Sequence, residues 1–258
     1  MKKVLCLLMC TAMILSNIVV PVNAANNSTC ATYGFAVDTS DYYKIGYTDY
    51  LVQYVYYGSV VIGTSNTIML FATQKEKVGS KYMNVAMYYT IMTPKAFTAK
   101  NQLGVATNYT GKSELLNVTT VLPKSTQSYR ASYPENVAGA SSYTLGGSAS
   151  LSSKGVTVGI TGSTKIEKNR LEVTNCSDVN KRKYSVTYDY KSAVLGTDAT
   201  NYYLKNQTVQ RGIFYYLTDG TSFSFPVTIK ASFGAYYGVY WYSNLASSTK
   251  TWNIKLGS

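Results

Sequence analysis

The sequence has no histidine among its 258 residues, and this absence excludes several kinds of active site. A Ser-His-Asp triad, a Cys-His pair and a zinc ion held by imidazole all require histidine. Charged side chains are also scarce, at 14% of residues, and only 12 side chains are acidic. These acids are scattered, so no pair of carboxylates and no calcium loop stands out. We therefore predict a protein that is not an enzyme, with no catalytic residues, no cofactor and no bound metal.

Apolar and aromatic residues are abundant instead. Hydrophobic residues make up 46% of the chain, and the 26 tyrosines are about one residue in ten. This composition is typical of a folded, β-rich protein and excludes a disordered chain. The formal net charge of +12 favours an anionic partner such as lipid headgroups or wall polymers. No nucleic-acid-binding motif accompanies the charge, so we predict no nucleic-acid partner.

The first 24 residues have the pattern of a secretory signal peptide. Lys2 and Lys3 precede an apolar stretch over 4–20, and Val22-Asn23-Ala24 offers the small residues that signal peptidase accepts. We predict that 1–24 is removed and that 25–258 is secreted as a single β-rich domain. An N-terminal membrane anchor is the alternative. No later window holds about 18 uninterrupted apolar residues, as a transmembrane helix would need.

Two cysteines remain after the signal peptide, Cys30 and Cys176. An isolated pair in an exported chain favours a disulfide, so we predict a Cys30–Cys176 bond. Two free thiols are the alternative.

Hydrophobicity alternates with period two along much of the chain, which indicates strands with one apolar face. Strands are expected over 50–61 and 81–92, and 211–233 is expected to form a hairpin. Pro226 within that hairpin suggests an edge strand or a bulge. The predicted fold class is all-β, either an antiparallel β-sandwich or an open barrel.

The segment 143–166 is a Gly/Ser-rich amphipathic hairpin in which Lys154 is the one charged residue between Thr144 and Thr164. A membrane-inserting hairpin needs one apolar face toward lipid and one polar face toward an aqueous lumen. The apolar, membrane-facing set is Leu145, Ala149, Leu151, Val156, Val158 and Ile160. The lumen-facing set is Ser148, Ser150, Thr157 and Thr161. An ordinary surface hairpin shows the same period, so both interpretations remain open.

Aromatic residues gather near the C-terminus, where Tyr240, Trp241 and Trp252 are the candidate contacts with a ligand or a membrane. Tryptophan and tyrosine favour the membrane–water interface, because an apolar ring and a polar tip are both accommodated there. The same rings can stack on sugars. Cross-strand packing inside the sheet is the alternative.

The order of features around the hairpin resembles the stem region of leukocidin/haemolysin-type β-pore-forming toxins. The resemblance covers residues 133–190, and its features follow one another along the chain. They are Tyr133-Pro134, the run Ser142-Tyr143-Thr144-Leu145-Gly146-Gly147-Ser148, the Gly/Ser-rich hairpin, and the alternating aromatic strand ending at Tyr190. The resemblance implies a hairpin that folds against a β-sandwich in the monomer and swings out during oligomerisation to line a transmembrane barrel.

Two hypotheses about function follow. In the first, a secreted, non-enzymatic protein binds a lipid membrane, forms a homo-oligomer there and inserts the hairpin to make a pore. In the second, the same β-sandwich is a binding module for cell-surface glycan or wall polymer and uses its C-terminal aromatic residues.

Overall fold

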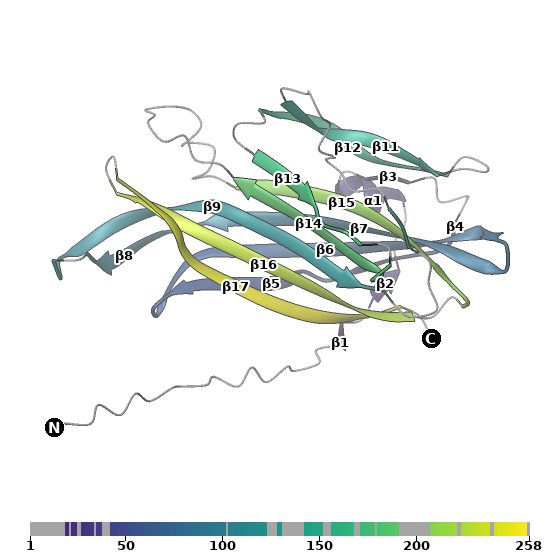
Figure 1. Ribbon diagram of the computed structural model, residues 1–258, viewed down its shortest axis with the longest axis horizontal. Coiled ribbons are helices and arrows are strands. Elements are labelled where there is room, and N and C mark those ends of the chain that lie inside the picture. The colour runs from purple at the N-terminus through teal and green to yellow at the C-terminus, as the bar shows by residue number, and fades with distance from the viewer. Residues whose placement is uncertain are drawn as a thin grey trace.

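The computed structural model consists of two β-sheets packed face to face, with a small third sheet beside them (Figure 1). The structure describes residues 19–20, 22–24, 27–33, 35–37, 42–101, 103–122, 128–130, 142–151, 156–167, 171–178, 180–190, 207–220, 223–237 and 240–256.

Within the described residues, the first sheet has the strand order β1-β17-β16-β9-β14-β13, with β8 beside β9. Its strands are β1 (Val19–Val20), β8 (Ala96–Lys100), β9 (Ala106–Val121), β13 (Leu171–Asn175), β14 (Lys183–Tyr190), β16 (Phe223–Tyr237) and β17 (Tyr240–Leu256). The second sheet has the order β10-β15-β7-β6-β4-β2, with β5 beside β6. Its strands are β2 (Val22–Ala24), β4 (Tyr42–Thr48), β5 (Leu51–Tyr57), β6 (Val60–Val78), β7 (Lys81–Pro94), β10 (Ser128–Arg130) and β15 (Thr208–Thr218).

A third sheet of the order β11-β12-β3 joins β3 (Phe35–Val37) to the hairpin of β11 (Ser142–Leu151) and β12 (Val156–Glu167). The helix α1 (Asn27–Thr32) leads into β3.

The main core lies between the two large sheets. On β16, the apolar residues that alternate with serine, threonine and lysine are buried from Phe225 to Phe233, as period-two patterning requires. Phe225 of β16 packs edge-on against Phe71 of β6 at 5.8 Å and against Phe214 of β15 at 6.2 Å between ring centroids. Burying one such side chain contributes about 1.5–3 kcal/mol. The predicted all-β antiparallel sandwich is confirmed, and neither large sheet closes on itself in the part of the chain described.

A cluster of tyrosine hydroxyls bridges the two sheets inside this core. The Tyr88 hydroxyl of β7 lies 2.8 Å from that of Tyr188 and 3.1 Å from that of Tyr184, both on β14. Tyr188 also donates to the carbonyl of Arg211 at 2.8 Å. Gly212 leaves room for the Tyr88 ring, since a Cβ at this position would overlap it. Burial raises the pKa of all three hydroxyls, so they stay neutral and satisfy one another's hydrogen bonds.

The hairpin expected over 211–233 is wrong. Strand β15 pairs with β7 and β10 in one sheet, whereas β16 pairs with β17 and β9 in the other. The two runs therefore face each other across the core, as the Phe214–Phe225 contact shows, instead of lying side by side. Sequence alternation is the same in both arrangements, because each run has one buried face.

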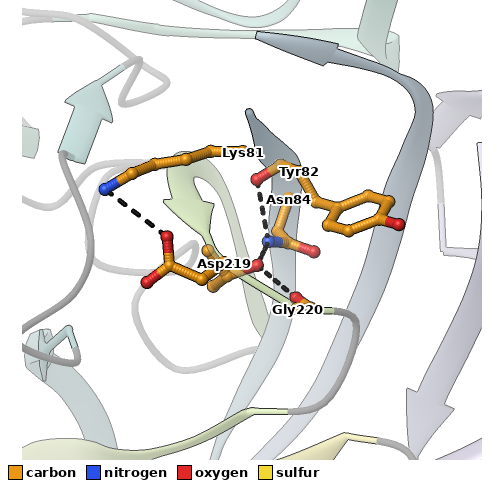
Figure 2. A network of polar contacts seen from close by, with 6 residues as sticks. Lys81, Tyr82, Asn84, Asp219 and Gly220 are labelled. Atoms are coloured by element: carbon orange, nitrogen blue, oxygen red, sulfur yellow. Dashed lines mark hydrogen bonds and ion pairs between the residues drawn. The ribbon is translucent and has the colours of Figure 1, made fainter. Parts of the chain in front are cut away.

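Polar contacts fix the crossing from β15 toward β16 (Figure 2). The Asn84 side-chain amide donates to the Thr218 hydroxyl at 2.7 Å, and that hydroxyl donates to the Gly220 carbonyl at 2.6 Å. Lys81 Nζ lies 3.7 Å from Asp219 Oδ1. The first residues of β7 thus hold the turn that carries the chain from one sheet to the other.

Two further expectations on strands need correction. The run 50–61 is two strands, because β5 ends at Tyr57 and Gly58 turns the chain with a φ of 59° before β6 begins. Pro226 lies in a central strand and not at an edge or in a bulge. The pairing of β16 with β9 begins only at Val227, so the missing N–H of Pro226 interrupts no ladder on that side.

The last residues of the predicted signal peptide form short strands. Val19–Val20 pairs in parallel with Asn253 and Ile254 of β17, and Val22–Ala24 pairs with β4. Residues 1–18 lie outside the described residues, and removal of 1–24 stays a prediction. Cleavage after Ala24 would take both strands away and uncover the end of β17. In the described part of the chain, no helix has the length and apolar character to span a membrane.

The predicted Cys30–Cys176 disulfide is wrong, because Cys176 is a free, exposed cysteine. Cys176 follows β13, where its backbone N–H donates to the Ser185 carbonyl at 2.8 Å. Cys30 belongs to α1, and its side chain lies outside the described part of the structure. Helix α1 leads to the third sheet, whereas β13 is the edge of the first sheet, so the two cysteines belong to different parts of the fold.

Candidate functional site

The hairpin predicted over 143–166 is present as β11 and β12, paired from Ser142 with Glu167 to Leu151 with Val156. The strands have 10 and 12 residues, and a strand that crosses a bilayer needs about 9–11. Cross-strand partners share a face of a sheet. The register pairs Ala149 with Val158 and Leu151 with Val156, and it pairs polar Ser150 with Thr157.

The register is irregular near the base of the hairpin. Leu145 pairs with Thr164 and Gly147 with Ile160, so Thr161 falls within the shift. Ser148 pairs with Gly159. The assignment of the apolar set to lipid and of the polar set to a lumen stays a prediction.

One short strand joins this hairpin to the rest of the molecule in the described residues. Val37, Ala36 and Phe35 of β3 pair with Val158, Gly159 and Ile160 of β12 (residues 158–160). The other partner of β12 is β11 itself. Figure 1 shows β11 and β12 above the two large sheets, with β3 and α1 between this hairpin and β15. In the strand pairing that the structure describes, the hairpin is therefore connected to β3 by three residue pairs and belongs to neither large sheet.

Contacts beside β3 fix this attachment to the second sheet. Arg211 of β15 donates from Nε to the Tyr33 carbonyl at 3.1 Å, and its guanidinium lies 5.2 Å from the Tyr89 ring centroid. The rings of Tyr33 and Tyr89 are 5.5 Å apart. Partial burial lowers the pKa of Arg211, which nonetheless stays charged at neutral pH. Residue 33 is thus held to β15 and β7 just before β3 begins.

A second feature lies at one end of the sandwich, which we call the aromatic end. Its rings are in contact across five strands and both large sheets, with centroid distances of 5.3–6.2 Å. Its members are Tyr57 of β5, Phe97 of β8, Tyr109 of β9, Tyr237 of β16 and Tyr242 of β17. Figure 1 shows the β5–β6 turn, the β8–β9 turn and the paired ends of β16 and β17 on the same side of the molecule.

The chain reaches the aromatic end by changing sheets after β7. The Lys95 N–H donates to the Ile62 carbonyl at 2.9 Å, and the Lys95 carbonyl accepts from the Gly111 N–H at 3.0 Å. A Cβ on Gly111 would lie 2.9 Å from the Ile62 carbonyl oxygen, so a glycine is needed at this close approach. The strands β8 and β9 then extend beyond this crossing as a hairpin arm.

The tip of that arm presents apolar side chains that the sequence analysis missed. Leu103 is 86% exposed and Val105 is 58% exposed. The Asn101 side chain accepts the N–H groups of both residues, at 2.9 and 3.0 Å, and Gly104 turns the chain with a φ of 77°. The turn therefore holds two exposed apolar residues in an ordered conformation. The signal was present in the sequence, because apolar residues on both sides of a turn glycine cannot both reach a core.

Tyrosines extend the exposed surface at the aromatic end. Tyr54 and Tyr56 of β5 are 50% and 53% exposed, with ring centroids 6.4 Å apart. Tyr237 and Tyr242 are also exposed. A cluster of exposed rings and aliphatic side chains at one end of a molecule indicates a binding surface.

The predicted aromatic contacts divide into two groups. Trp252 is buried in the core at 3% exposure, with Lys250 Nζ 5.1 Å from its ring, so the prediction that it contacts a membrane or a sugar is wrong for this fold. Its position alternates with Thr251 and Asn253, which is the pattern of a core residue. Tyr240 and Trp241 pair with Tyr237 and Tyr236 at the end of β16 and β17. Their side chains lie outside the described part of the structure.

A buried ion pair, also missed from sequence, lies where β9 bends toward the aromatic end. Lys112 Nζ is 2.5 Å from Glu114 Oε1, and both side chains are buried. Burial lowers the pKa of Lys112 to about 8, and the Glu114 carboxylate offsets part of that shift. Lys112 Nζ also lies 5.8 Å from the Tyr236 ring centroid. Charged residues in a strand are usually exposed, so the pattern Lys-Ser-Glu alone predicts a solvated position.

Comparison with known proteins finds likeness in structure. No family model matches the chain, and no curated protein matches its sequence. Clostridium perfringens delta-toxin is similar with a TM-score of 0.47 and 10% identity, over 87% of this chain and 98% of that chain. The membrane-inserted form of the Clostridium perfringens NetB toxin has a TM-score of 0.40 and 7% identity, over 82% and 91% of the two chains. A pore-forming protein has a TM-score of 0.43 and 10% identity, over 83% and 88%. Two toxins and a pore-forming protein are thus among the solved structures to which this chain is similar, in agreement with the resemblance stated for 133–190.

Proposed function

We propose that this protein is secreted, binds lipid membranes through the aromatic end, assembles into a homo-oligomer and inserts the β11–β12 hairpin to form a pore. The observation that carries the proposal is the hairpin itself. Its strands are long enough to cross a bilayer. From Ala149–Val158 to Leu151–Val156 its register pairs apolar with apolar and polar with polar residues, and three backbone pairs connect β12 with β3.

Oligomerisation follows from the hydrogen-bonding needs of such a hairpin. One hairpin supplies two strands, and each strand has an outer edge of unpaired N–H and C=O groups. Lipid offers no partners for these groups, so the edges have to pair with further hairpins until a ring is closed. Several copies of the chain are therefore required for one pore.

The aromatic end supports the membrane-binding step. Tyrosine rings and aliphatic side chains at a rigid tip suit the membrane–water interface, where apolar atoms enter the acyl region and hydroxyls stay hydrated. The mature chain, which lacks Lys2 and Lys3, has a formal net charge of +10 instead of the +12 of the full sequence, and this charge adds attraction to anionic lipid.

Dye release from liposomes by the purified mature chain (25–258) tests the proposal. We expect release from vesicles with anionic lipid to exceed release from zwitterionic vesicles, and small dyes to escape before large dextrans. SDS-resistant oligomers should form only when lipid is present. Retention on polysaccharide or cell walls without release from any vesicle would instead favour the glycan-binding module, to which exposed tyrosines are also suited.

The binding step has its own test in Val105, which directly precedes β9, and Val121, which is the last residue of β9. Val105→Asp places a charge at the aromatic end and is expected to weaken vesicle binding about tenfold, because a charged group is costly to move from water into the interface. Val121→Asp is the matched control, since Val121 is 45% exposed at the other end of the same strand. Co-sedimentation with vesicles measures both, and equal loss in the two variants would remove the aromatic end as the contact surface.

A further inference from the structure

Irregularities in three neighbouring strands coincide around Glu114. Glu114 falls between two register pairs of β9 with β16, because Leu115 pairs with Ser232 and Ser113 with Phe233. The β16–β17 register shifts as well, so that Gly234 stands opposite the three β17 residues 243–245. Bulges of this kind bend strands, and Figure 1 shows β9, β16 and β17 strongly curved.

The Glu114 carboxylate connects these irregularities. One oxygen accepts Lys112 Nζ at 2.5 Å within β9, and the other accepts the backbone N–H of Asn244 in β17. Asn244 has a φ of 50°, a conformation that asparagine tolerates better than most residues. Gly234 leaves the necessary space, since a Cβ there would lie 2.5 Å from Glu114 Oε1 and 2.6 Å from Lys112 Cε.

This bridge lies at the base of an arm that carries part of the aromatic end. Beyond the irregularity, β16 and β17 remain paired: Ala235 is the partner of Tyr242, and Tyr237 is the partner of Tyr240. Tyr237 and Tyr242 on this arm contact Tyr109 of β9 at 5.9 and 5.7 Å between centroids. The direction in which the arm leaves the sheet therefore decides whether these rings meet.

We propose that Glu114 is a positioning residue of the aromatic end: by bonding Asn244 it fixes the β16–β17 arm against β9. The inference rests on the proposed membrane binding for its functional consequence. A buried ion pair is weak evidence of stabilisation, because well-packed apolar residues often replace one without loss. The Glu114 carboxylate, however, also accepts a hydrogen bond from the irregular part of β17, and an apolar side chain cannot make this bond.

The test compares two double variants that differ in one acceptor. Lys112→Met with Glu114→Gln removes both charges and keeps an oxygen for the Asn244 N–H, whereas Lys112→Met with Glu114→Met removes the acceptor too. Neither leaves an unpaired buried charge. Both are made in a Trp252→Phe background, so that Trp241 on the arm is the one remaining tryptophan.

Two measurements are made on each variant. Acrylamide quenching of Trp241 fluorescence in solution reports the placement of the arm without any lipid. Co-sedimentation with vesicles of equal parts phosphatidylcholine and phosphatidylglycerol reports binding. We expect the Gln variant to behave as its Trp252→Phe parent does. The Met variant should show about twofold stronger quenching and about tenfold weaker binding, at an unfolding temperature close to that of the Gln variant.

The outcomes separate the inference from the function on which it rests. Equal quenching in the two variants would overturn the positioning role, whatever the vesicles show. A difference in quenching, with no vesicle binding by the parent protein, would support the role of Glu114 and count against membrane binding. Lys181→Met at the exposed Lys181–Asp178 pair is the matched control for the loss of a lysine, and it should change neither measurement.

Discussion

A disulfide between β3 and β12 is expected to abolish dye release from vesicles, and reduction is expected to restore it. The substitutions are Ala36→Cys and Gly159→Cys, which fall on Cα partners in the register of the two strands. Cys30 and Cys176 are changed to serine so that no other bond can form. Partners in an antiparallel pair have Cα atoms about 4.5–5.5 Å apart, which is within the range of a disulfide.

The expected effect is large because the proposed mechanism requires β12 to leave β3. Three register pairs are easily separated, but a covalent bond at the middle pair is not. The oxidised protein should still bind vesicles, since the aromatic end is untouched, and release should fall to background. Adding a thiol reductant to vesicle-bound protein should start release from a synchronised population.

The matched control is a disulfide inside the hairpin. Ala149→Cys and Val158→Cys join β11 to β12 at partners in their shared register. This bond lets the hairpin move as a unit, so oxidised protein of this kind should release dye as the reduced form does. If the β3–β12 disulfide permits full release without reductant, then β11–β12 is not the inserting element, and the proposed function loses its main support.

This hairpin could be predicted from the alternation and turn residues of one short segment. Strand and turn signals within 143–166 gave boundaries within one residue of the observed Ser142 and Glu167, because both strands are neighbours in sequence. The contact with β3 had no such signal. Residues 35–37 lie more than a hundred positions away in the sequence. The alternation of a short apolar segment is compatible with many partner strands and does not identify one of them.

The same limit explains the misassigned partners of β15 and β16. Alternation identifies a buried face, yet it does not say whether two successive strands lie side by side or on opposite sheets. Polar contacts near the end of β15 accompany the crossing to the opposite sheet. One of them is made by Asn84, which belongs to a strand far away in sequence. Burial of Trp252, in contrast, could have been read from its place between Thr251 and Asn253.

The Lys112–Glu114 pair shows why burial at a bulge cannot be predicted from period-two alternation. Four successive residues, 111–114, are buried, which breaks the alternation seen on either side in β9. The extra residue brings Glu114 inward, and no pattern in the sequence marks it. In the sequence, the indication of close packing here is limited to Gly111 and Gly234. A Cβ on Gly111 would overlap the backbone of Lys95, and one on Gly234 would overlap the side chains of the ion pair.

Replacing Lys112 by methionine should lower the free energy of unfolding by about 3–5 kcal/mol, the usual cost of leaving one buried charge without its partner. Such a loss is a large part of the roughly 5–15 kcal/mol that stabilises a typical domain. The Glu114 carboxylate would keep its bond from Asn244 but lose its counter-charge. Urea unfolding followed by far-UV circular dichroism measures the change. Lys112→Met combined with Glu114→Gln should recover most of it, and a double variant as unstable as the single one would show that packing, not charge, is responsible.

The pH dependence of stability gives an independent check on the same pair. Burial lowers the pKa of Lys112 from 10.5 to about 8, so above pH 8 the folded protein releases a proton that the unfolded chain still holds. Stability therefore rises with pH between these two values and loses this gain as pH falls through 8. By pH about 9 the gain should be about 1 kcal/mol relative to the Lys112→Met/Glu114→Gln variant, which has no titrating group there. Tyrosines of the unfolded chain begin to ionise as the pH approaches 10, but both proteins contain the same tyrosines, so their contribution cancels in the comparison. A constant difference between the two proteins across this range would mean that Lys112 does not change its charge, and that its ammonium is better solvated than its burial indicates.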